Sequence, residues 1–232
     1  MHRFTYLFLG LAVLLPVLVI LAYRKDLRRP ALLAGLAGAI GGPIAEIFYF
    51  HDYWRPMTVF GLAKPSIEDA LFGFAITCLA ITIYPALTHS SFVHNQKPRR
   101  RLLVGLLAAA FVCMVLGTFL LRFNSIFVSA SLFFLLAIII LVMRRDLIPL
   151  AMWSCAAMTV YIFLVYLIMF AVLDPQFWDK YWLLAHTRLD VRLLGIPLTE
   201  LLWYISQAFI ISVMYPFYSG SSAIKLSHVH SK

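Results

Sequence analysis

The chain has 232 residues, of which 63% are hydrophobic and only 12% are charged, and its mean hydropathy is +0.92. This composition excludes a water-soluble domain, because too few polar groups are available to cover its surface. The net charge of +9 is gathered in the loops between apolar runs. Basic loops of this kind are typical of segments beside anionic lipid, so the charge does not indicate a nucleic-acid-binding protein.

Seven apolar runs follow one another along the chain and leave almost no residues for a soluble domain. They lie near 4–22, 31–50, 66–88, 101–121, 124–143, 147–173 and 197–218. Each run is long enough to cross a hydrocarbon core of roughly 30 Å at about 1.5 Å per helical residue. The sequence therefore predicts an all-α integral membrane protein with seven transmembrane helices, forming a single membrane domain over residues 1–232.

The distribution of Lys and Arg predicts the orientation of these helices. Twelve of the 19 basic residues lie in the loops at 23–30 and 89–101, after the fifth run and in the tail at 219–232, and seven lie on the other side. Cytoplasmic loops carry the excess of positive charge in membrane proteins. We therefore expect a multi-pass protein of the cell membrane, with its N-terminus outside and a cytoplasmic C-terminal tail.

Two distant segments, 52–85 and 179–216, repeat the same order of features. Each contains an Asp, a Tyr-Trp pair, a basic residue and a Pro-x-x-Glu, followed by an apolar run that ends in Tyr-Pro. The order predicts two parallel three-helix repeats, at about 1–88 and 124–218, joined by a connecting helix at about 101–121. Repeats of this kind tend to form their site at the interface between them.

Four acidic residues lie in or at the ends of the apolar runs. Glu68 and Glu200 each follow a proline by three residues, Asp69 is next to Glu68, and Glu46 lies within the second run. Proline and acidic residues are both favoured at a helix start, and this is a sufficient explanation for Asp69. A preference for helix starts does not explain why Glu68 and Glu200 are both embedded beside aromatic residues. Ionisable residues at membrane depth usually mark a functional site.

The type of residue in this pattern suggests a proton-transfer chemistry. Two buried acids that face each other would repel if both were ionised, so one is expected to stay protonated. A protonated acid in a dry aromatic pocket can protonate an alkene, aromatic faces can stabilise the resulting cation, and a second carboxylate can remove a proton. We predict Glu68 and Glu200 as the acid and base, in either order, with Glu46 and Asp69 as further catalytic candidates. The aromatic residues predicted to contact the substrate are Phe72, Trp203, Tyr204, Trp54 and Trp182, although the last two also fit an interfacial aromatic belt.

The stretches KPSIEDALFGFAI and GIPLTELLWYISQAFI, with the Tyr-Trp pairs before them, resemble the lycopene cyclase domain family of small membrane carotenoid cyclases. Members of the family usually show Pro-x-Glu-Glu, and here Ile67 and Thr199 stand in place of the first acid. The resemblance implies a cofactor-independent, non-redox cyclisation of a long isoprenoid polyene such as lycopene, an intramolecular isomerase-type reaction. It also implies a hydrophobic isoprenoid substrate taken from the lipid bilayer.

Two other functions fit parts of the pattern. The chain also resembles, more distantly, the fungal membrane terpene cyclases, which act on other isoprenoids. A proton-coupled carrier of a hydrophobic small molecule would also contain repeats and buried acids. A retinal protein is excluded because all six lysines lie in loops or tails, where none can form the Schiff base. No metal site is expected, since Cys78, Cys113 and Cys155 lack metal-ligand spacing.

Overall fold

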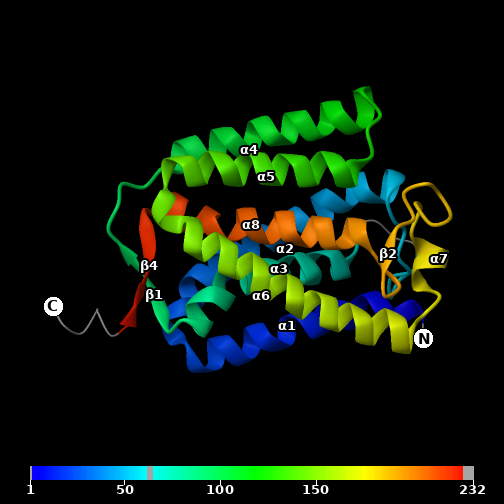
Figure 1. Cartoon of the computed structure of the whole chain (residues 1–232), viewed down its shortest axis with the longest axis horizontal. Helices are drawn as coiled ribbons and strands as arrows, with labels where there is room; N and C mark the ends of the chain where they lie inside the picture. Colours follow the sequence, from blue (N-terminus) through cyan, green and yellow to red (C-terminus); the bar gives the residue numbers. More distant parts are fainter. Residues whose placement is uncertain (1, 62–64, 227–232) are drawn as a thin grey trace.

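The computed structural model describes residues 2–61 and 65–226. Figure 1 shows a bundle of long helices that lie side by side. The long helices are α1 (Thr5–Tyr23), α2 (Arg28–Asp52), α3 (Ile67–Leu87), α4 (Arg100–Val115), α5 (Ser125–Met143), α6 (Ile148–Tyr166) and α8 (Leu198–Ser219). The π-helical segments η3 (Leu116–Leu120) and η5 (Leu167–Leu173) extend α4 and α6. Short 3-10 turns form η1 (His2–Phe4), η2 (Lys25–Leu27) and η4 (Arg145–Leu147).

Seven helices of the described chain are long and apolar enough to cross a membrane, which confirms the seven predicted spans. Large apolar side chains point outward along them; Leu15 on α1 is 62% exposed and Val142 on α5 is 68% exposed. A soluble protein would leave these side chains in water at a cost of roughly 1.5–3 kcal/mol each, whereas lipid accommodates them. The outer surface of the bundle therefore supports the predicted membrane location.

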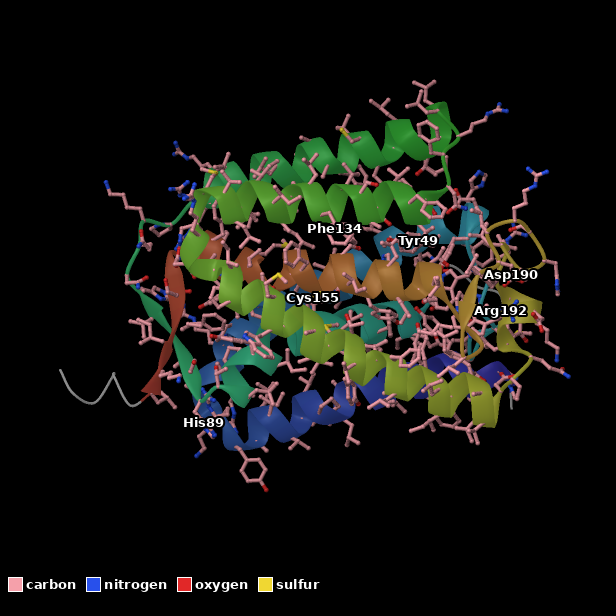
Figure 2. All side chains as sticks on the ribbon, in the orientation of Figure 1. Tyr49, His89, Phe134, Cys155, Asp190 and Arg192 are labelled. Atoms are coloured by element: carbon pink, nitrogen blue, oxygen red, sulfur yellow. The ribbon has the colours of Figure 1, made fainter. Side chains whose placement is uncertain are left out.

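The bundle has two distinct ends (Figure 1). Helices α1, α3, α5 and α8 begin at the end that carries the short helix α7 (Phe177–Tyr181) and the hairpin of β2 (Arg192–Leu193) and β3 (Ile196–Pro197). We call this the α7 end. Helices α2, α4 and α6 begin at the opposite end, where β1 (Ser90–His94) and β4 (Ser221–Lys225) lie. Figure 2 shows His89 at this β1–β4 end, and Asp190 and Arg192 at the α7 end.

Helix α3 is the most enclosed of the spans, and α2 packs against it at backbone distance. An ideal Cβ built on Gly38 lies 2.2 Å from the Gly73 carbonyl oxygen, and one built on Gly42 lies 2.2 Å from that of Asp69. Any larger residue at these positions would push the helices apart. The small residues that the sequence places along α2 thus serve close helix packing, and they hold the start of α3 against α2.

The same contacts recur after α1 and after α5. Arg24 ends α1, pairs with Asp26 and donates to the Ser90 carbonyl oxygen. Arg144 ends α5, pairs with Asp146 at 2.7 Å and donates to the Ser221 carbonyl oxygen at 2.8 Å. Arg24 therefore links the turn between α1 and α2 to β1, which follows α3. Arg144 links the turn between α5 and α6 to β4, which follows α8.

Segments from the two halves of the chain also pair with each other at both ends of the bundle. Strands β1 and β4 are antiparallel, with Phe92 opposite Ala223 at the middle of the ladder. At the α7 end Trp54 and Trp182, which belong to the two Tyr-Trp pairs, form an antiparallel bridge. The nitrogen of Arg55 donates to the Tyr181 carbonyl oxygen there. Each end is thus closed by one segment from each half of the chain.

These short strands differ from the purely helical prediction. Within the predicted cytoplasmic tail, 221–225 form β4, and 227–232 lie outside the described residues. The strand is directed by Gly220, whose φ of 71° ends α8 in the left-handed conformation that glycine adopts most readily. A Cβ at Gly220 would lie 2.2 Å from the Gln96 carbonyl oxygen, so the turn also depends on the absence of a side chain.

Candidate active site

A cavity of about 740 Å³ lies inside the bundle and is lined mostly by apolar side chains of α2, α3, α4, α5 and α8. Three acidic residues from three different helices line it: Glu46 of α2, Asp69 of α3 and Glu200 of α8. All three are at most 5% exposed. Two tyrosines, Tyr6 of α1 and Tyr166 of α6, complete the wall near the acids. The α7 end of the cavity is therefore an acidic and aromatic pocket.

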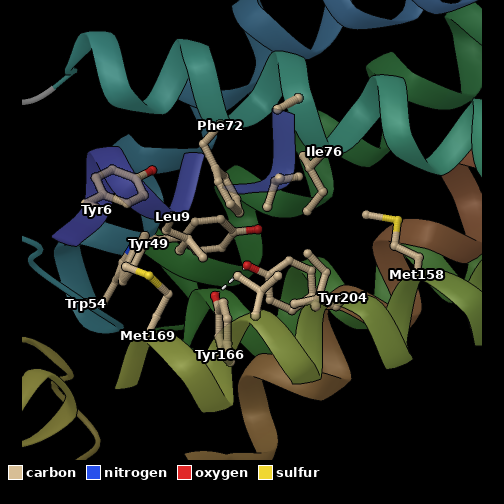
Figure 3. Close-up of a cluster of buried hydrophobic side chains, with 14 of the residues drawn as sticks. Tyr6, Leu9, Tyr49, Trp54, Phe72, Ile76, Met158, Tyr166, Met169 and Tyr204 are labelled. Atoms are coloured by element: carbon tan, nitrogen blue, oxygen red, sulfur yellow. Dashed lines mark hydrogen bonds between the residues drawn. The ribbon is translucent and has the colours of Figure 1, made fainter. Parts of the chain in front are cut away.

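Glu200 is held by tyrosine hydroxyl groups. Its Oε1 accepts a hydrogen bond from Tyr53 at 2.6 Å, and its Oε2 accepts one from Tyr166 at 2.9 Å. The Tyr166 hydroxyl also meets that of Tyr204, as the dashed line in Figure 3 shows. Glu200 lies in the first turn of α8, where the N-cap residue Pro197 makes no side-chain cap. Its carboxyl group is therefore oriented by other helices and faces the cavity.

Tyr53 remains a hydrogen-bond donor under ordinary conditions. Burial, and then the neighbouring charge of Glu200, raise the pKa of Tyr53 well above its usual value. The phenol therefore keeps its proton at neutral pH. Its oxygen also lies 3.0 Å from the Thr199 hydroxyl, which fixes the direction in which it donates.

Asp69 caps the start of α3 with one carboxylate oxygen and accepts a hydrogen bond from Tyr6 with the other. Its Oδ2 accepts from the Ser66 nitrogen at 2.7 Å, and the Ser66 hydroxyl accepts from the Asp69 nitrogen at 3.2 Å, which forms a capping box at the start of α3. Its Oδ1 accepts from the Tyr6 hydroxyl at 2.8 Å. The aspartate thus explains the helix start, as its position in the sequence predicts, and also lines the cavity with Glu200.

Glu46 links the acidic pocket to the bridge between Trp54 and Trp182 at the α7 end. Its Oε2 accepts a hydrogen bond from Trp54 Nε1 at 3.0 Å. The ring of Trp54 packs edge-on against Tyr6, with centroids 5.0 Å apart. Trp54 lines the cavity, whereas Trp182, its partner in the bridge, is not among the described lining residues. Of the three predicted tryptophans, Trp54 and Trp203 line the described cavity and Trp182 does not.

Glu68 lies next to Asp69 in the sequence but points elsewhere. Its Oε1 accepts from the Val59 nitrogen in the loop before α3, and its buried Oε2 has no hydrogen-bond partner among the described residues. Glu68 is not among the described residues that line the cavity. Of the two adjacent acids at the start of α3, Asp69 shares the cavity with Glu200 and Glu46, although the Pro-x-x-Glu spacing pairs Glu200 with Glu68.

The predicted aromatic residues form the wall beside the acids. Phe72 and Tyr204 meet edge to face at 6.4 Å between ring centroids, and Trp203 lies against Tyr204 at 5.0 Å. Trp203 also donates to the Tyr49 hydroxyl at 2.7 Å. Figure 3 shows Phe72, Tyr49 and Tyr204 around one space, with Tyr6 close by. Several aromatic faces and edges thus surround the acid groups.

Sequence reasoning missed the tyrosines that hold the acids. Tyr53 belongs to a repeated Tyr-Trp pair, and that repetition is a signal that could have identified it. Tyr6 and Tyr166 are single polar residues in apolar runs, and nothing in the sequence separates them from other tyrosines such as Tyr161, which donates to the Ala12 carbonyl oxygen. Their role depends on helix packing, which brings α1 to α3 and α6 to α8.

No cation pairs with the two acids within the described part of the chain. The described ion pairs include neither Asp69 nor Glu200; at the α7 end Arg192 instead bonds Asp190 and Asp179, at 2.6 and 2.8 Å. The described residues also contain no group of three or more His, Cys, Asp or Glu side chains arranged to hold a metal ion. The described donors to the two carboxylates are neutral hydroxyl groups and a backbone nitrogen.

Comparison with known proteins relates one half of the chain to a family. Residues 124–218, which include α5, α6, α7 and α8, match a family model described as lycopene cyclase. No curated protein and no solved structure matches the chain. The matched region contains Glu200 and its tyrosine partner on α6, and it suggests a function of the carotenoid cyclase type. Over residues 124–218 the chain is therefore similar to the lycopene cyclase family, as the resemblance in its sequence indicates.

Proposed function

We propose that the protein is a proton-initiated, non-redox cyclase of a long isoprenoid polyene such as lycopene. The observation that carries the proposal is Glu200, a buried carboxyl group that lines a mostly apolar cavity and accepts hydrogen bonds from the hydroxyl groups of Tyr53 and Tyr166. Burial without a cation favours the protonated form of a carboxyl group, which is the form that can donate a proton. The lycopene cyclase match over the same helix supports this reading.

The reaction balances without an oxidant or a reductant. The proton of the Glu200 carboxyl group forms a C–H bond with a terminal alkene carbon, and the electron pair of that double bond is consumed. A second double bond attacks the resulting tertiary cation, which closes the ring and moves the positive charge to a ring carbon. Loss of a proton from a neighbouring carbon restores a double bond, so the product has the mass of the substrate.

The geometry favours Asp69 over Glu68 as the second acidic group. Asp69 lines the same cavity as Glu200, whereas Glu68 bonds the loop at Val59. In the proposed reaction, the proton that leaves the ring goes to a carboxylate, and both Asp69 and the newly ionised Glu200 are available. The faces of Phe72, Trp203 and Tyr204 would stabilise the cation in between.

We also propose that the two halves are parallel repeats, with α1 to α3 corresponding to α5, α6 and α8, and α4 as the connecting helix. The recurrent arginine contacts and the pairing of corresponding segments at both ends support this arrangement. The axis that relates the halves would run along the bundle, which is the direction of the membrane normal in parallel repeats. Under this arrangement Asp69 and Glu200 occupy corresponding positions on α3 and α8.

The proposed orientation in the cell membrane places the β1–β4 end in the cytoplasm and the acids toward the outer leaflet. The basic residues at Arg24, Arg99 to Arg101 and Arg144 lie near the β1–β4 end, which supports this choice. A reporter fused after Lys232 should score as cytoplasmic, and a tag in the 183–190 loop should be accessible from outside. The opposite result for both would reverse the orientation.

The test of the function uses a bacterial host that accumulates lycopene. Membranes that contain the protein should yield a product of unchanged mass with altered retention and absorbance, and membranes that contain Glu200→Gln at the same abundance should not. Unchanged lycopene in the presence of well-inserted protein would contradict the proposal. Uptake of polyene into vesicles without any product would favour the carrier instead.

A further inference from the structure

The cavity extends far beyond the acids. On α8 it is lined from Glu200 to Tyr218, a separation of 18 residues, which corresponds to about 27 Å along a helix. Met214 and Leu103, which also line it, lie toward the β1–β4 end. The cavity is therefore a long channel that runs most of the way along the bundle, with the acids at one end.

One side of this channel is open between α2 and α4. Both helices line it, but α2 packs along α3, and α4 packs on α5 and α8. Ile44 of α2 and Val104 of α4 line the channel and are 41% and 61% exposed. Side chains that belong both to a cavity wall and to the exposed surface mark its opening. In a membrane this opening faces the acyl chains.

Small side chains form most of the wall that α2 contributes to the channel. The residues that it contributes along the opening are mainly Ala and Gly: Ala34, Ala37, Gly38, Gly41 and Ala45. Gly38 is required by the contact with α3, but a Cβ on Gly41 would meet no atom within 4 Å. Gly41 therefore leaves space in the channel that packing within the chain does not use.

Near the acids the opening is closed by aromatic rings. Phe48 of α2 meets Phe111 of α4 edge to face at 6.1 Å, and it meets Phe119 of η3 at 5.4 Å. Behind them Tyr49 and Trp203 are joined by a hydrogen bond. The acidic pocket is therefore screened from the bilayer, while the rest of the channel is accessible to it.

We propose that the channel between α2 and α4 binds the unreacted length of a linear, long-chain isoprenoid hydrocarbon that enters sideways from the bilayer. The inference rests on the proposed function and deepens it by naming the shape of the substrate and its path. The channel is continuous with the acidic pocket and long enough for an extended chain. Apart from the acids and the tyrosines, its lining is mostly apolar, with Thr77, Ser129 and Gln207 as further polar side chains. One end of the chain reaches Glu200 while the other lies toward Tyr218.

The arrangement has a consequence for the order of reaction. The described channel has acidic residues at one end only, so each binding event presents one end of the chain to Glu200. A chain that is to be cyclised at both ends must leave through the opening and return reversed. A product with one ring is therefore an obligatory free intermediate on the way to a product with two.

The test narrows the channel at a position where an added Cβ would not clash with the rest of the protein. Gly41→Phe places a ring in the channel, and Gly105→Phe on α4 is its matched control, because a Cβ there also meets no atom within 4 Å and Gly105 is not among the described lining residues. Leu107→Trp narrows the same opening from the α4 side. Binding of lycopene to purified protein in lipid nanodiscs, measured by quenching of tryptophan fluorescence, is compared with product formation and thermal unfolding.

We expect Gly41→Phe and Leu107→Trp to weaken lycopene binding at least 10-fold with unchanged unfolding temperature, and Gly105→Phe to bind as the unaltered protein does. Unchanged binding in either folded narrowing variant would overturn the channel. If the unaltered protein binds lycopene and both variants do not, but no product ever forms, the channel stands and the cyclase function fails. Release of a two-ring product without any free one-ring product would refute the proposed reversal.

Discussion

Helices α3 and α8 begin in similar sequence but hold their acids in different ways. At the start of α3, Asp69 closes a capping box with Ser66 and accepts from a single tyrosine. At the start of α8 no side chain caps the helix, and Glu200 receives two tyrosine hydroxyls from outside its own helix. Asp69 stabilises the start of its own helix, whereas Glu200 makes no capping contact in α8. The difference favours Glu200 as the residue that transfers the proton.

The helices that flank α3 and α8 also differ between the two halves of the chain. Helix α3 packs along α6. The corresponding pair in the proposed repeat, α8 and α2, is separated by the cavity, and α4 borders the gap. If the two halves are repeats, as proposed, they differ in that α2 and α8 have the cavity between them. This cavity contains both the acids and the proposed entrance.

The largest effect is expected from Glu200→Gln. Glutamine retains the shape and accepts a hydrogen bond but cannot donate an acidic proton, so cyclisation should fall by about 10² or more, as general acid catalysis contributes roughly 10² to 10⁴. Product formation at matched membrane abundance measures it. Turnover equal to that of the unaltered protein would remove Glu200 from the mechanism.

Tyr166→Phe should have the next largest effect. It removes the hydroxyl that donates to Glu200 Oε2 and contacts Tyr204. Glu200 becomes charged as it donates its proton, and a hydrogen bond to a charged group contributes about 1.5–3 kcal/mol, so we expect activity to fall roughly 10- to 100-fold. Tyr161→Phe is the matched control, because Tyr161 lies on the same helix but donates to the Ala12 carbonyl oxygen. Equal losses in both variants would indicate a packing effect instead.

Asp69→Asn should reduce activity less, by about 10-fold, and should also destabilise the start of α3. Loss of a helix cap costs about 0.5–2 kcal/mol, which thermal unfolding in detergent can measure. Its comparison is Glu68→Gln, which keeps an acceptor for the Val59 nitrogen and should change activity less than about 3-fold. If Glu68→Gln instead lost as much activity as Glu200→Gln, the pairing predicted from the sequence would be correct.

The smallest effect on activity is expected at the β1–β4 end. Arg144→Ala and Arg24→Ala each remove hydrogen bonds to an aspartate and to a strand carbonyl. We expect a loss of about 1–3 kcal/mol in stability, greater for Arg144 because its side chain is 4% exposed against 14% for Arg24. Activity per folded molecule should remain unchanged. A specific loss of turnover would link this end to the distant acids.

Much of the architecture could be predicted because membrane spans depend on local composition. The seven spans follow from the length and hydropathy of the apolar runs alone. The site was harder to predict, since the direction of a side chain depends on helix phase. The one-residue difference between Glu68 and Asp69 rotates a side chain by about 100° around α3, and only the packing of α3 determines which one faces Glu200. The strands could not be predicted, because their pairing joins residues far apart in the sequence.

The pairing of β1 with β4 also bears on how the chain assembles during synthesis. Strand β1 leaves the ribosome well before β4, because α4, α5, α6 and α8 lie between them. Until β4 arrives, β1 has an open edge, which is the kind of surface that joins other chains. The last contacts that unite the halves therefore form after all seven spans have been inserted. We expect substitutions in β4 to reduce the yield of assembled protein more than the activity of the molecules that do assemble.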